Sequence, residues 1–558
     1  MFKSESALSR RQFLEFLGHM SLTTAASVAV PSVLSSCAHR PTRTTESSIP
    51  WEKIFIRPSS EDQVILAQGL QQKILLKWQD PIAKGGVQFG TNNDFCAFVP
   101  KDVMAPTDGV LMVNHEFVHP LMVSGFNEAL NKSKTQEQVD IEQKSVGVSL
   151  LRFHKVDDEW KVDFHSPLNR RITAQTAIPF VSKHPIEGAM TAKGTLANCA
   201  GGVTPWGTFL TCEENYDQFY GEWDYSPKPG TKARRKRPKR TFVSKDLSWS
   251  LHDDRPPTHY GWVVEINPWT GAAKKHSALG RFCHEGATCV RTKSGLTTVY
   301  MGDDKASEYL YKFISAKPDS LEEGTLYVAQ MKTGRWLPLQ MDSHPEFTER
   351  FLNQTDLLMR VREAAKILGA TPLARPEDVE INPANGDVIV ALTNNSGEAD
   401  YHGSFLKIVE DQADPGALTF KFSTWISGGP QSGISCPDNL AFDKSGNLWC
   451  TNDISDEKMN QGIYSPFKNN GLYYIPMKGP RAGIVFQVAS APRDAEFTGP
   501  MFTPDGETLL LSVQHPGEQT KDLANPTSSW PDGKGKLPKS ALLAITGDTL
   551  KRLVNFRG

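Results

Sequence analysis

A short stretch, NCAGGVTPWGTFLTCEEN (residues 198–215), combines residue types that bind metal ions. Cys199 precedes a double glycine, and Cys212 comes directly before two glutamates. A thiolate beside carboxylates is unusual for calcium alone and points to a transition metal. The double glycine lets another backbone approach closely, which favours Cys199 as a ligand over a buried structural cysteine. Cys212 lies within an apolar stretch, so we expect it to pack in the core.

Acidic side chains recur in a similar setting along the chain. Taken singly, an Asp or Glu at such a position is more often a turn cap than a ligand. The set comprises Glu187, Glu213, Glu214, Glu285, Asp303, Asp304, Glu377, Asp438 and Asp453. If several of these carboxylates converge, multivalent cations must offset their mutual repulsion, and hard oxygen donors favour calcium, magnesium or ferric iron.

Short strands between turns are the elements that must position these residues. Five repeats each place a polar cluster before a turn and a strand that ends in further polar residues. They cover residues 198–215, 284–304, 375–395, 436–453 and 497–516, and a sixth begins near Val110 or in the IEGAM segment, 186–190. Such repeated hairpins predict the blades of a β-propeller, whose innermost strands converge on one axis. A β-sandwich is the alternative, but it leaves the repeated polar positions unexplained.

Helical segments are few in this mainly β sequence. Residues 353–370 carry apolar side chains at helical spacing, with Gly369 where a C-cap belongs, and predict one amphipathic helix. We place helical and loop insertions near residues 127–143, 228–256 and 341–370. The basic run KARRKRPKR, 232–240, indicates a solvated loop, with contact to an anionic membrane surface or polyanionic material as the functional alternative.

The N-terminus carries an export pattern. The segment SRRQFL, residues 9–14, is a twin-arginine motif, and the following residues 16–34 are too polar for a stable membrane span. We therefore expect residues 1–37 to be a Tat signal, which makes the Tat translocase a partner and places the protein in the periplasm or outside the cell. LSSC, ending at Cys37, fits a lipobox that would tether the protein to a membrane, and ordinary cleavage nearby is the alternative. A linker, 38–50, and a single catalytic domain, 51–558, follow.

Charge and cysteine content narrow the function further. The formal net charge is −2, which gives no indication of nucleic-acid binding. Of the eight cysteines, seven follow Cys37, and an odd number predicts at least one free or metal-bound thiol. Cys283 and Cys289 are candidates for the core or for a disulfide.

The chain resembles the PhoX-type alkaline phosphatases, and the matching motifs span nearly the whole of the predicted mature chain in order. They are NHE (114–116), IEGA (186–189), the 198–215 stretch, HEGA (284–287), MGDD (301–304), RPED (375–378), TNN (393–395), CPDN (436–439), QHPGE (514–518) and TSSWPDG (527–533).

The resemblance implies a six-bladed propeller that hydrolyses phosphate monoesters outside the cytoplasm and releases inorganic phosphate. It implies two ferric ions, several calcium ions and a bridging oxo group at one end of the axis, with a cysteine among the ligands. It implies the metal ligands Cys199, Glu213, Glu285, Glu377, Glu187, Asp303, Glu116 and Asp438. It also implies Arg375 and Glu377 as catalytic residues and Arg375, His115 and Asn395 as substrate-binding residues, and we expect a monomer.

Arg375 suits this chemistry on physical grounds. Its planar fork donates two parallel hydrogen bonds to a phosphate group, which a lysine cannot do. In an extended segment Arg375 and Glu377 share a face, so one tripeptide can hold a metal and the phosphate together. A salt bridge to a neighbouring acid is the alternative role of the arginine.

Two other functions stay open. The first is a calcium-dependent propeller hydrolase of another type, a lactonase or a phosphodiesterase, against which Cys199 argues. The second is a lipid-tethered scaffold without catalysis, which has no need of Arg375 beside Glu377.

Overall fold

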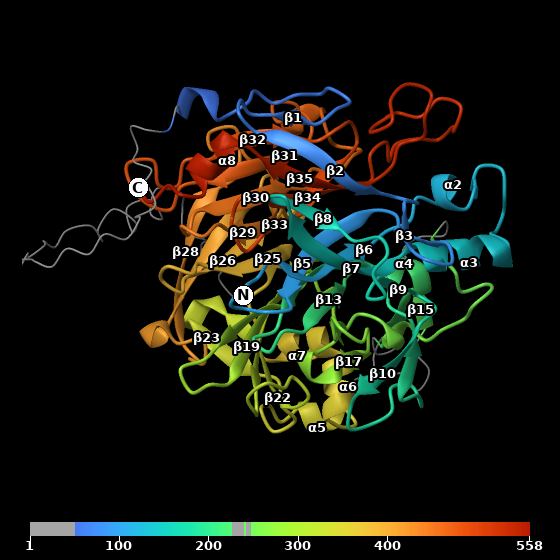
Figure 1. The fold of residues 1–558 in the computed structure, drawn as a ribbon. Coiled ribbons are helices and arrows are strands. Elements are labelled where there is room, and N and C mark those ends of the chain that lie inside the picture. The colour runs from blue at the N-terminus through green and yellow to red at the C-terminus, as the bar shows by residue number, and fades with distance from the viewer. Residues whose placement is uncertain (1–48, 50, 226–238, 242–246) are drawn as a thin grey trace, which may run out of the picture. The chain divides into compact units, whose positions relative to one another are not determined.

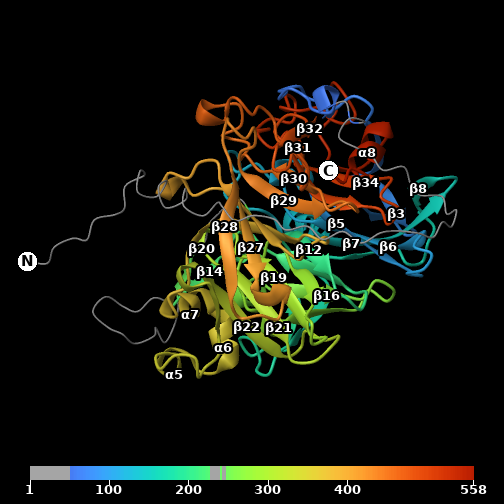
Figure 2. The same cartoon turned by 90° about the vertical axis from the view of Figure 1, so that its left-hand side faces the viewer.

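Six sheets, antiparallel except for one parallel pair of strands in the second blade, are arranged as the blades of a β-propeller and make up most of the computed structural model (Figures 1 and 2). The predicted six-bladed fold is therefore confirmed. The structure describes residues 49, 51–225, 239–241 and 247–558. The predicted signal with Cys37, the predicted linker apart from residue 49, and most of the basic run lie outside these residues.

The innermost strands line the axis and form a closed ring. Each packs against the innermost strand of the blade on either side. In ring order they are β5 (Asn93–Pro100), β12 (Asn198–Val203), β18 (Thr288–Arg291), β25 (Pro376–Ile381), β29 (Pro437–Phe442) and β33 (Glu496–Phe502).

A second strand pairs antiparallel with each innermost strand. These strands are β6 (Asp108–His115), β13 (Phe209–Glu213), β19 (Thr297–Gly302), β26 (Val388–Leu392), β30 (Leu448–Asn452) and β34 (Leu509–Gln514). The five sequence repeats coincide with the hairpins of blades 2 to 6. Of the two candidates for the sixth, Val110 lies in blade 1, whereas the IEGAM segment lies in an outer connection of blade 2.

Further strands complete the blades on the outside. In blades 1 and 2 they are β7 (Gly147–Val156), β8 (Glu159–Val162) and β9 (Arg170–Ile172), then β16 (Val263–Ile266), β17 (Ala273–His276), β10 (Ala177–Val181) and β11 (Thr191–Lys193). In blades 3 and 4 they are β21 (Leu310–Ser315), β22 (Gly324–Gln330) and β23 (Arg335–Pro338), then β27 (Ser404–Glu410) and β28 (Phe420–Ser427). In blades 5 and 6 they are β31 (Gly471–Ile475), β32 (Phe486–Ser490) and β1 (Ile65–Leu66), then β35 (Ala541–Thr546) and β2 (Gln71–Lys77). Three small hairpins lie outside the blades: β3 (Pro81–Ala83) with β4 (Val87–Gln88), β14 (Glu222–Asp224) with β15 (Lys239–Thr241), and β20 (Ala306–Glu308) with β24 (Leu373–Ala374).

The N-terminal strands close the ring. β1 pairs with β32 in blade 5, and β2 pairs with β35 in blade 6. Upstream of both, the ring of Trp51 packs against Phe486 and Phe556. Residues from the start of the described chain thus complete the two blades that its C-terminal part builds.

The helices are short and lie outside the blades. They are α2 (Pro120–Val123), α3 (Gln136–Ser145), α4 (Asp217–Tyr220), α5 (Phe347–Arg350), α6 (Gln354–Met359), α7 (Val361–Ile367) and α8 (Asp548–Leu553). Single 3₁₀ turns are η2 (Trp51–Lys53), η3 (Pro257–His259), η4 (Ser277–Leu279), η5 (Met331–Thr333), η6 (Ser396–Glu398), η7 (Asp411–Ala413) and η8 (Gly462–Tyr464). Figure 2 shows α5, α6 and α7 gathered beside β22. No helix in the described ranges is both long and apolar enough to span a membrane.

The single helix predicted over residues 353–370 is wrong, because the structure breaks it into α6 and α7. Asn353 caps α6 by accepting a hydrogen bond from the backbone nitrogen of Asp356. Arg360 leaves the helical conformation, with φ −120° and ψ 38°. Its guanidinium donates to the carbonyl oxygen of Arg350 and contacts the carboxylate of Asp356. Contacts to the preceding turn thus hold the break, which helical periodicity alone does not reveal.

Apolar side chains pack between adjacent blades and make the ring rigid. Leu472 of blade 5 is fully buried in one cluster with Leu509 and Leu511 of blade 6. Burial of each such side chain contributes roughly 1.5–3 kcal/mol. The seven cysteines in the described part of the chain are all free thiols, so Cys283 and Cys289 do not form the disulfide considered for them.

Candidate metal centre

The innermost hairpins of all six blades open toward one cavity on the axis. In five blades the last paired residues at this end are Asn93 with His115, Asn198 with Glu213, His284 with Asp303, Pro376 with Leu392, and Pro437 with Asn452. Successive side chains of a strand point to opposite faces. The residues that face the cavity are therefore the ones that follow these pairs: Asp94 and Glu116, Cys199 and Glu214, Glu285 and Asp304, Glu377, and Asp438 and Asp453. Blade 6 contributes Glu496 and Thr498.

Irregular backbone redirects the side chains at the cavity end of the inner hairpins. Five of the six inner hairpins have a register shift just inside it. A bulge of this kind bends a strand and redirects its side chains. Asn92, Ala197, Arg375 and Cys436, each directly before an innermost strand, have φ of 42°, 51°, 53° and 54°. A strained conformation at the same position in four blades is the mark of a geometry that the fold imposes.

The cavity is small and rich in carboxyl groups. Its volume is about 90 Å³. It is lined by Asp94, Glu116, Cys199, Glu214, Asn215, Glu285, Asp304, Arg375, Glu377, Asp438, Asp453, Glu496 and Thr498. Among these described residues nine carry carboxyl groups, and one, Arg375, carries a positive charge.

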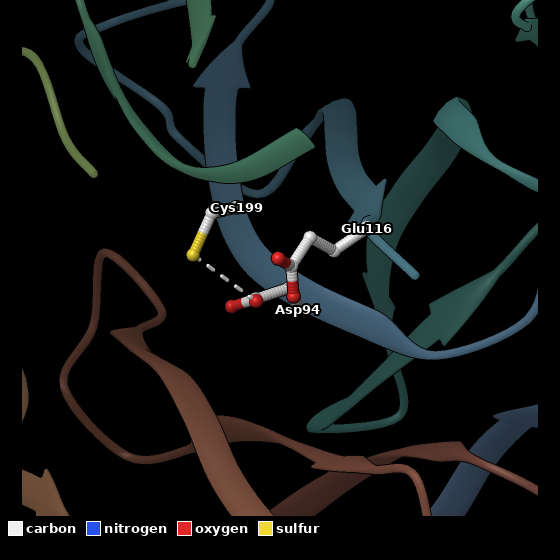
Figure 3. Close-up of side chains that lie close together, drawn as sticks. All are labelled: Asp94, Glu116 and Cys199. Atoms are coloured by element: carbon white, nitrogen blue, oxygen red, sulfur yellow. Dashed lines mark hydrogen bonds between the residues drawn. The ribbon is translucent and has the colours of Figure 1, made fainter. Parts of the chain in front are cut away.

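Cys199 lies between carboxylates of two other blades. Its sulfur is 3.2 Å from Oε2 of Glu285 and 3.5 Å from Oδ2 of Asp94. Figure 3 shows Cys199, Asp94 and Glu116 pointing toward one another from β12, β5 and the end of β6. Burial and the surrounding carboxylates raise the pKa of the Cys199 thiol well above its usual value. The thiol therefore needs a cation if it is to act as a thiolate.

Three overlapping groups of ligand atoms are close enough to hold cations. Within each group one ligand atom per residue lies within 4.8 Å of the others. The groups are Asp94, Glu116 and Cys199; Cys199, Glu214 and Glu285; and Glu285, Glu377 and Asp438. Cys199 and Glu285 each belong to two groups, so the three positions form one continuous cluster.

The double glycine of blade 2 explains why Glu285 meets Cys199. A Cβ atom on Gly202 would lie 2.1 Å from the carbonyl oxygen of Ala287 in blade 3. Without it, the backbone nitrogen of Ala200 donates to the carbonyl oxygen of Glu285 at 3.0 Å. The predicted role of this glycine pair, close backbone approach, matches the structure and fixes Glu285 opposite the sulfur.

Two asparagine side chains orient carboxylates from different blades. Nδ2 of Asn215 donates to Glu116 at 3.1 Å and to Glu214 at 2.7 Å. Nδ2 of Asn439 donates to Oε1 of Glu285 at 3.1 Å. Such outer hydrogen bonds hold one carboxylate oxygen and leave lone pairs of the group free for a cation.

Burial and mutual repulsion raise the pKa values of six of the cavity carboxyl groups. Burial first, and neighbouring carboxylates second, raise the pKa well above its usual range for Asp94, Glu214, Glu285, Glu377 and Asp438. The same two causes raise the pKa of Glu496 to about 8, although its contact with His515 opposes them. Asp304 shifts the other way: burial raises its pKa, but Arg375 above all, with Glu214 and Lys305, outweighs burial and lowers the pKa to about 2.

The donor set fits a cluster of multivalent cations. Oδ1 of Asp94, Oε1 of Glu214 and Oε2 of Glu496 are buried, and no hydrogen-bond donor in the described part of the chain reaches them. An unpaired buried carboxylate oxygen is costly. Cations that ligate these oxygens remove both this cost and the repulsion between the carboxylates. Oxygen ligands with one thiolate match hard cations together with one that accepts sulfur.

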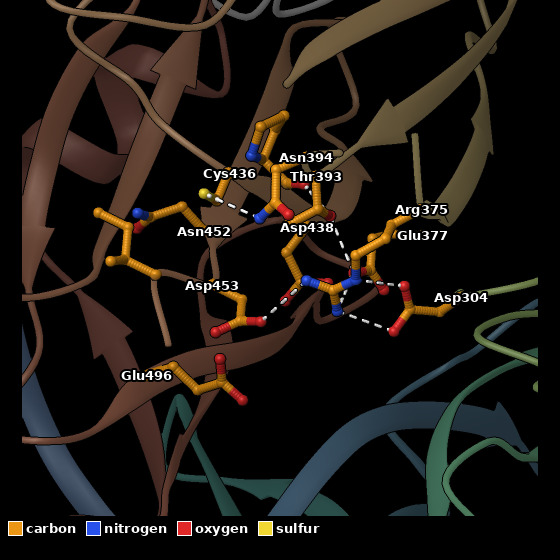
Figure 4. Close-up of polar contacts among 12 residues, drawn as sticks. Asp304, Arg375, Glu377, Thr393, Asn394, Cys436, Asp438, Asn452, Asp453 and Glu496 are labelled. Atoms are coloured by element: carbon orange, nitrogen blue, oxygen red, sulfur yellow. Dashed lines mark hydrogen bonds and ion pairs between the residues drawn. The ribbon is translucent and has the colours of Figure 1, made fainter. Parts of the chain in front are cut away.

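Arg375 stands at the edge of the cavity in contact with three acids (Figure 4). Its Nε and Nη2 each donate to an oxygen of Asp304 at 2.8 Å. Nη2 also lies 2.8 Å from Oε1 of Glu377, and Nη1 lies 3.7 Å from Asp453. The expected meeting of Arg375 and Glu377 side chains is thus present, and so is the salt bridge considered as an alternative. Nη1 is the least engaged nitrogen of the group.

The structure brings together most of the predicted site residues. Cys199, Glu116, Glu285, Glu377, Asp438 and Arg375 all line the cavity.

Two predicted ligands miss the cavity by a single residue. Glu213 is buried and faces the blade, where Oε1 lies 2.7 Å from Nζ of Lys275. Asp303 likewise points away from the cavity and accepts from Nε of Arg362 at 2.8 Å. Each belongs to the last pair of its hairpin, so the next residue takes the cavity face. The metal roles predicted for Glu213 and Asp303 therefore do not fit their positions, and the next residues, Glu214 and Asp304, line the cavity instead.

Three further predicted residues lie elsewhere. Glu187 is exposed in a tight turn of the connection between β10 and β11. His115 is fully buried behind the cavity, where Nε2 contacts Oγ of Ser149 at 2.7 Å and Phe89 packs on its ring. Asn395 is buried and donates to Oγ of Ser307 at 3.0 Å. Neither the metal role predicted for Glu187 nor the substrate role predicted for His115 fits these positions, and Asn395 does not line the cavity.

Other lining residues were not predicted as ligands. Glu214, Asp304 and Asp453 belong to the acidic set but received no role, whereas Asp94 and Glu496 were missed altogether. Asp94 is the second residue of β5, as Cys199 is the second residue of β12, and this shared position is a signal that the sequence offers. Glu496 stands one residue before the fifth repeat.

Comparisons with known proteins agree with this geometry. The family model described as alkaline phosphatase PhoX matches residues 54–517. Among solved structures, Pseudomonas fluorescens PhoX in complex with vanadate, a transition state analogue, superposes with a TM-score of 0.77. It shares 28% sequence identity, over 89% of this chain and 98% of that chain. The comparison with curated proteins found no match.

Two further solved structures are too distantly similar to this chain to indicate its activity. A protein of unknown function from Dyadobacter fermentans shares 9% identity over 86% of this chain and 100% of that chain, with a TM-score of 0.39. A gluconolactonase from Xanthomonas campestris shares 10% identity over 88% of this chain and 97% of that chain, with a TM-score of 0.34.

Proposed function

This chain belongs to the alkaline phosphatase PhoX family and is a phosphomonoester hydrolase, and we propose that it works outside the cytoplasm at a mixed iron–calcium cluster on the propeller axis. Its substrates are small phosphate esters, and inorganic phosphate is released. The cluster has two ferric ions, several calcium ions and a bridging oxo group. The twin-arginine segment directs export through the Tat translocase, and the enzyme acts as a monomer.

The observation that carries this proposal is the lining of the cavity. Nine carboxyl groups and a thiol surround a space of about 90 Å³ that holds one guanidinium group. Cations that neutralise this many carboxylates also attract the negative charge of a phosphoryl group, and Arg375 lies at the edge of the cavity, where it can bind phosphate oxygens.

When bound, the ions would neutralise charge on the phosphoryl group and activate the nucleophile. The protein supplies orientation. Arg375 binds phosphate oxygens, with Nη1 the nitrogen most free to do so. Asp304 and Glu377 fix its plane before substrate arrives. Because Glu377 both touches Arg375 and belongs to a ligand group, it links substrate binding to the cluster.

The thiol of Cys199 indicates which part of the cluster would hold iron. Sulfur is a poor ligand for calcium and a good one for iron. The two ligand groups that contain Cys199 are therefore the iron side, and the group of Glu285, Glu377 and Asp438, which has oxygen ligands alone, is where calcium fits best. Glu285 belongs to groups on both sides, so its carboxylate would hold ions of both kinds.

Elemental analysis and enzyme assay test the proposal together. Purified enzyme is analysed for iron and calcium per chain, then assayed with a chromogenic phosphate monoester, with and without the calcium chelator EGTA. We expect both metals, and activity that falls with EGTA and returns with calcium. Active enzyme without either metal would overturn the cluster. Faster cleavage of a lactone or a phosphate diester than of the monoester would support the other hydrolase functions instead.

Cell fractionation tests export. A twin-lysine replacement at Arg10 and Arg11 should keep the enzyme in the cytoplasm, while the wild type is found outside it. Replacement of Cys37 by serine should release the enzyme from membranes if lipid tethers it there. Equal distribution of the wild type and the twin-lysine variant would overturn the export proposal.

A further inference from the structure

Three histidines stand in the motifs of this family, and the structure separates them. His115 and His284 are fully buried in blade cores, where His284 stacks on Phe282 at 3.5 Å between ring centroids. His515 follows the last residue of β34 and lies beside the cavity lining. Of the three, His515 alone touches a carboxylate that lines the cavity, within the described residues.

Both ring nitrogens of His515 are engaged. Nε2 lies 3.1 Å from Oε1 of Glu496, and Nδ1 lies 2.8 Å from Oε2 of Glu518. Nδ1 also lies 3.1 Å from the carbonyl oxygen of Asp494. These three oxygen atoms hold the ring in one orientation, and it donates to both sides when both ring nitrogens carry a proton.

The backbone holds the ring in place. His515 has φ of 36°, a conformation that few side chains other than glycine and asparagine adopt readily. The nitrogen of Gly517 donates to the carbonyl oxygen of Arg493, which ties the segment to the loop before β33. Nε2 of His119, from blade 1, lies 3.0 Å from the carbonyl oxygen of Glu518. The ring is thus fixed from blades 1 and 6.

Glu496 is a cavity carboxylate held by one oxygen only. Its Oε1 contacts His515, while its Oε2 is buried without a hydrogen-bond donor in the described chain. The figure of the site shows Glu496 below Asp453, its carboxylate toward the acids of the cavity (Figure 4). Glu496 belongs to none of the three ligand groups described above. Its contact with a cation therefore depends on the direction in which its carboxylate points.

We propose that His515 is a positioning residue that holds Glu496 with Oε2 directed at the cation cluster, and that Glu518 holds His515 in turn. The inference rests on the proposed function, because it needs cations in the cavity. A carboxylate with one oxygen fixed has lost much of its rotational freedom before it binds a cation. His515 thereby raises the affinity of the cluster for calcium without touching an ion or the substrate. It also leaves His515 with no free nitrogen for the leaving alcohol.

Two amide substitutions separate the two contacts of the ring. The amide nitrogen of glutamine falls near the position of Nε2, and that of asparagine falls near Nδ1. His515→Gln therefore keeps a donor for Glu496, whereas His515→Asn keeps a donor for Glu518 alone. His515→Ala removes both, and His184→Ala, at an exposed site, is the control.

The experiment measures calcium retention by the purified holoenzyme. Each protein is equilibrated with EGTA–calcium buffers, separated from free ions, and analysed for bound calcium, with kcat and KM recorded alongside. Substitution of residues that orient ligands lowers metal affinity about 10- to 100-fold. We expect that loss in His515→Ala and His515→Asn, with near wild-type retention in His515→Gln and His184→Ala. With saturating calcium, KM for the ester should stay unchanged in all four variants.

The outcomes divide clearly. Calcium retention in His515→Ala and His515→Asn equal to that of the wild type would overturn the inference and leave the proposed function standing. A loss that is the same in His515→Gln as in His515→Asn would assign the effect to packing and overturn it as well. Wild-type enzyme that holds neither calcium nor iron would overturn the proposed cluster itself, and the inference with it.

Discussion

Arg375 of blade 4 and Asp304 of blade 3 form a two-point ion pair, with Nε and Nη2 each 2.8 Å from a different carboxylate oxygen. Two hydrogen bonds to one carboxylate hold the plane of the guanidinium group in one orientation. The pair thus fixes the plane of the group that is to bind phosphate. Because its two members come from different blades, the rigidity of the ring sets this geometry rather than a local loop.

Arg375→Lys should lower kcat/KM for a phosphate monoester by about 100-fold and weaken inhibition by inorganic phosphate. The lysine keeps the charge but loses the fork that binds Asp304, and with it the fixed position of Nη1 for phosphate. Iron and calcium per chain should not change. The matched control is Arg152→Lys, which breaks a similar fork to Asp108 away from the cavity. Unchanged kcat/KM in Arg375→Lys would show that the arginine does not bind phosphate.

Cys199→Ser should lower iron content and activity together, since a hydroxyl group gives up its proton far less readily than a thiol. Calcium content should fall less than iron content. Cys212→Ser is the control, because Cys212 lies in the same stretch but is buried in an apolar cluster. It should reduce stability and leave iron per folded chain unchanged. Full iron content in Cys199→Ser would rule the thiolate out as a ligand.

Glu213, the last residue of β13, and Glu214, directly after it, should affect different properties when each is replaced by glutamine. Glu214→Gln should weaken cation binding, because this carboxylate faces the cavity. Glu213→Gln should instead leave the buried Nζ of Lys275 without its charged partner and reduce the free energy of unfolding by about 3–5 kcal/mol. Metal analysis and urea unfolding of both variants measure the two effects. The reverse result, with metal loss in Glu213→Gln alone, would contradict the one-residue correction.

Sequence could identify the blades because each inner hairpin repeats the same polar positions beside an alternating strand. It could identify Cys199, Glu285 and Glu377 because each stands in a distinctive motif. It could not decide between Glu213 and Glu214, since the face of a strand depends on register, and register depends on which partner residue is last in the pair. The bulges that set this register leave no local signature in the sequence.

Features whose position depends on distant parts of the chain also could not be predicted from the sequence. Glu496 is an ordinary glutamate at the start of a strand, and its place in the cavity depends on closure of the whole ring. The two N-terminal strands pair with residues more than 400 positions away, a connection that no local pattern reveals. The break at Arg360 depends on contacts with the preceding turn and not on helix propensity.

Removal of residues 1–77 should destabilise the propeller more than removal of residues 1–48. The longer deletion takes away β1 and β2 and leaves the edges of β32 and β35 unpaired. Exposed edges of this kind promote aggregation. We expect the longer deletion to aggregate or to melt at a lower temperature, and the shorter one to melt like the full chain after export. Equal melting temperatures of the two would mean that the N-terminal strands do not close the ring.

The buried carboxylate of Glu265 should make stability depend on acid pH. It accepts hydrogen bonds from Nε1 of Trp206 at 3.0 Å and Oγ1 of Thr208 at 2.7 Å, and Nε2 of His276 lies 2.7 Å away. Although burial opposes them, these contacts lower the pKa of Glu265 to about 2. A carboxyl group with a lowered folded-state pKa adds stability above its unfolded pKa of about 4.3 and loses it as the pH falls toward 2.

Glu265→Gln should therefore reduce the free energy of unfolding by roughly 2–3 kcal/mol at pH 7, with the difference from the wild type shrinking between about pH 5 and pH 3. The sign follows from proton binding: in that range the unfolded wild type takes up a proton that the folded wild type does not, so acid destabilises the wild type and spares the variant. Urea unfolding at a series of pH values measures it. Glu159→Gln is the control, because its ion pair with Lys73 is exposed and contributes little. A difference between Glu265→Gln and the wild type that stayed constant from pH 7 to pH 3 would mean that shape, and not charge, accounts for the role of Glu265.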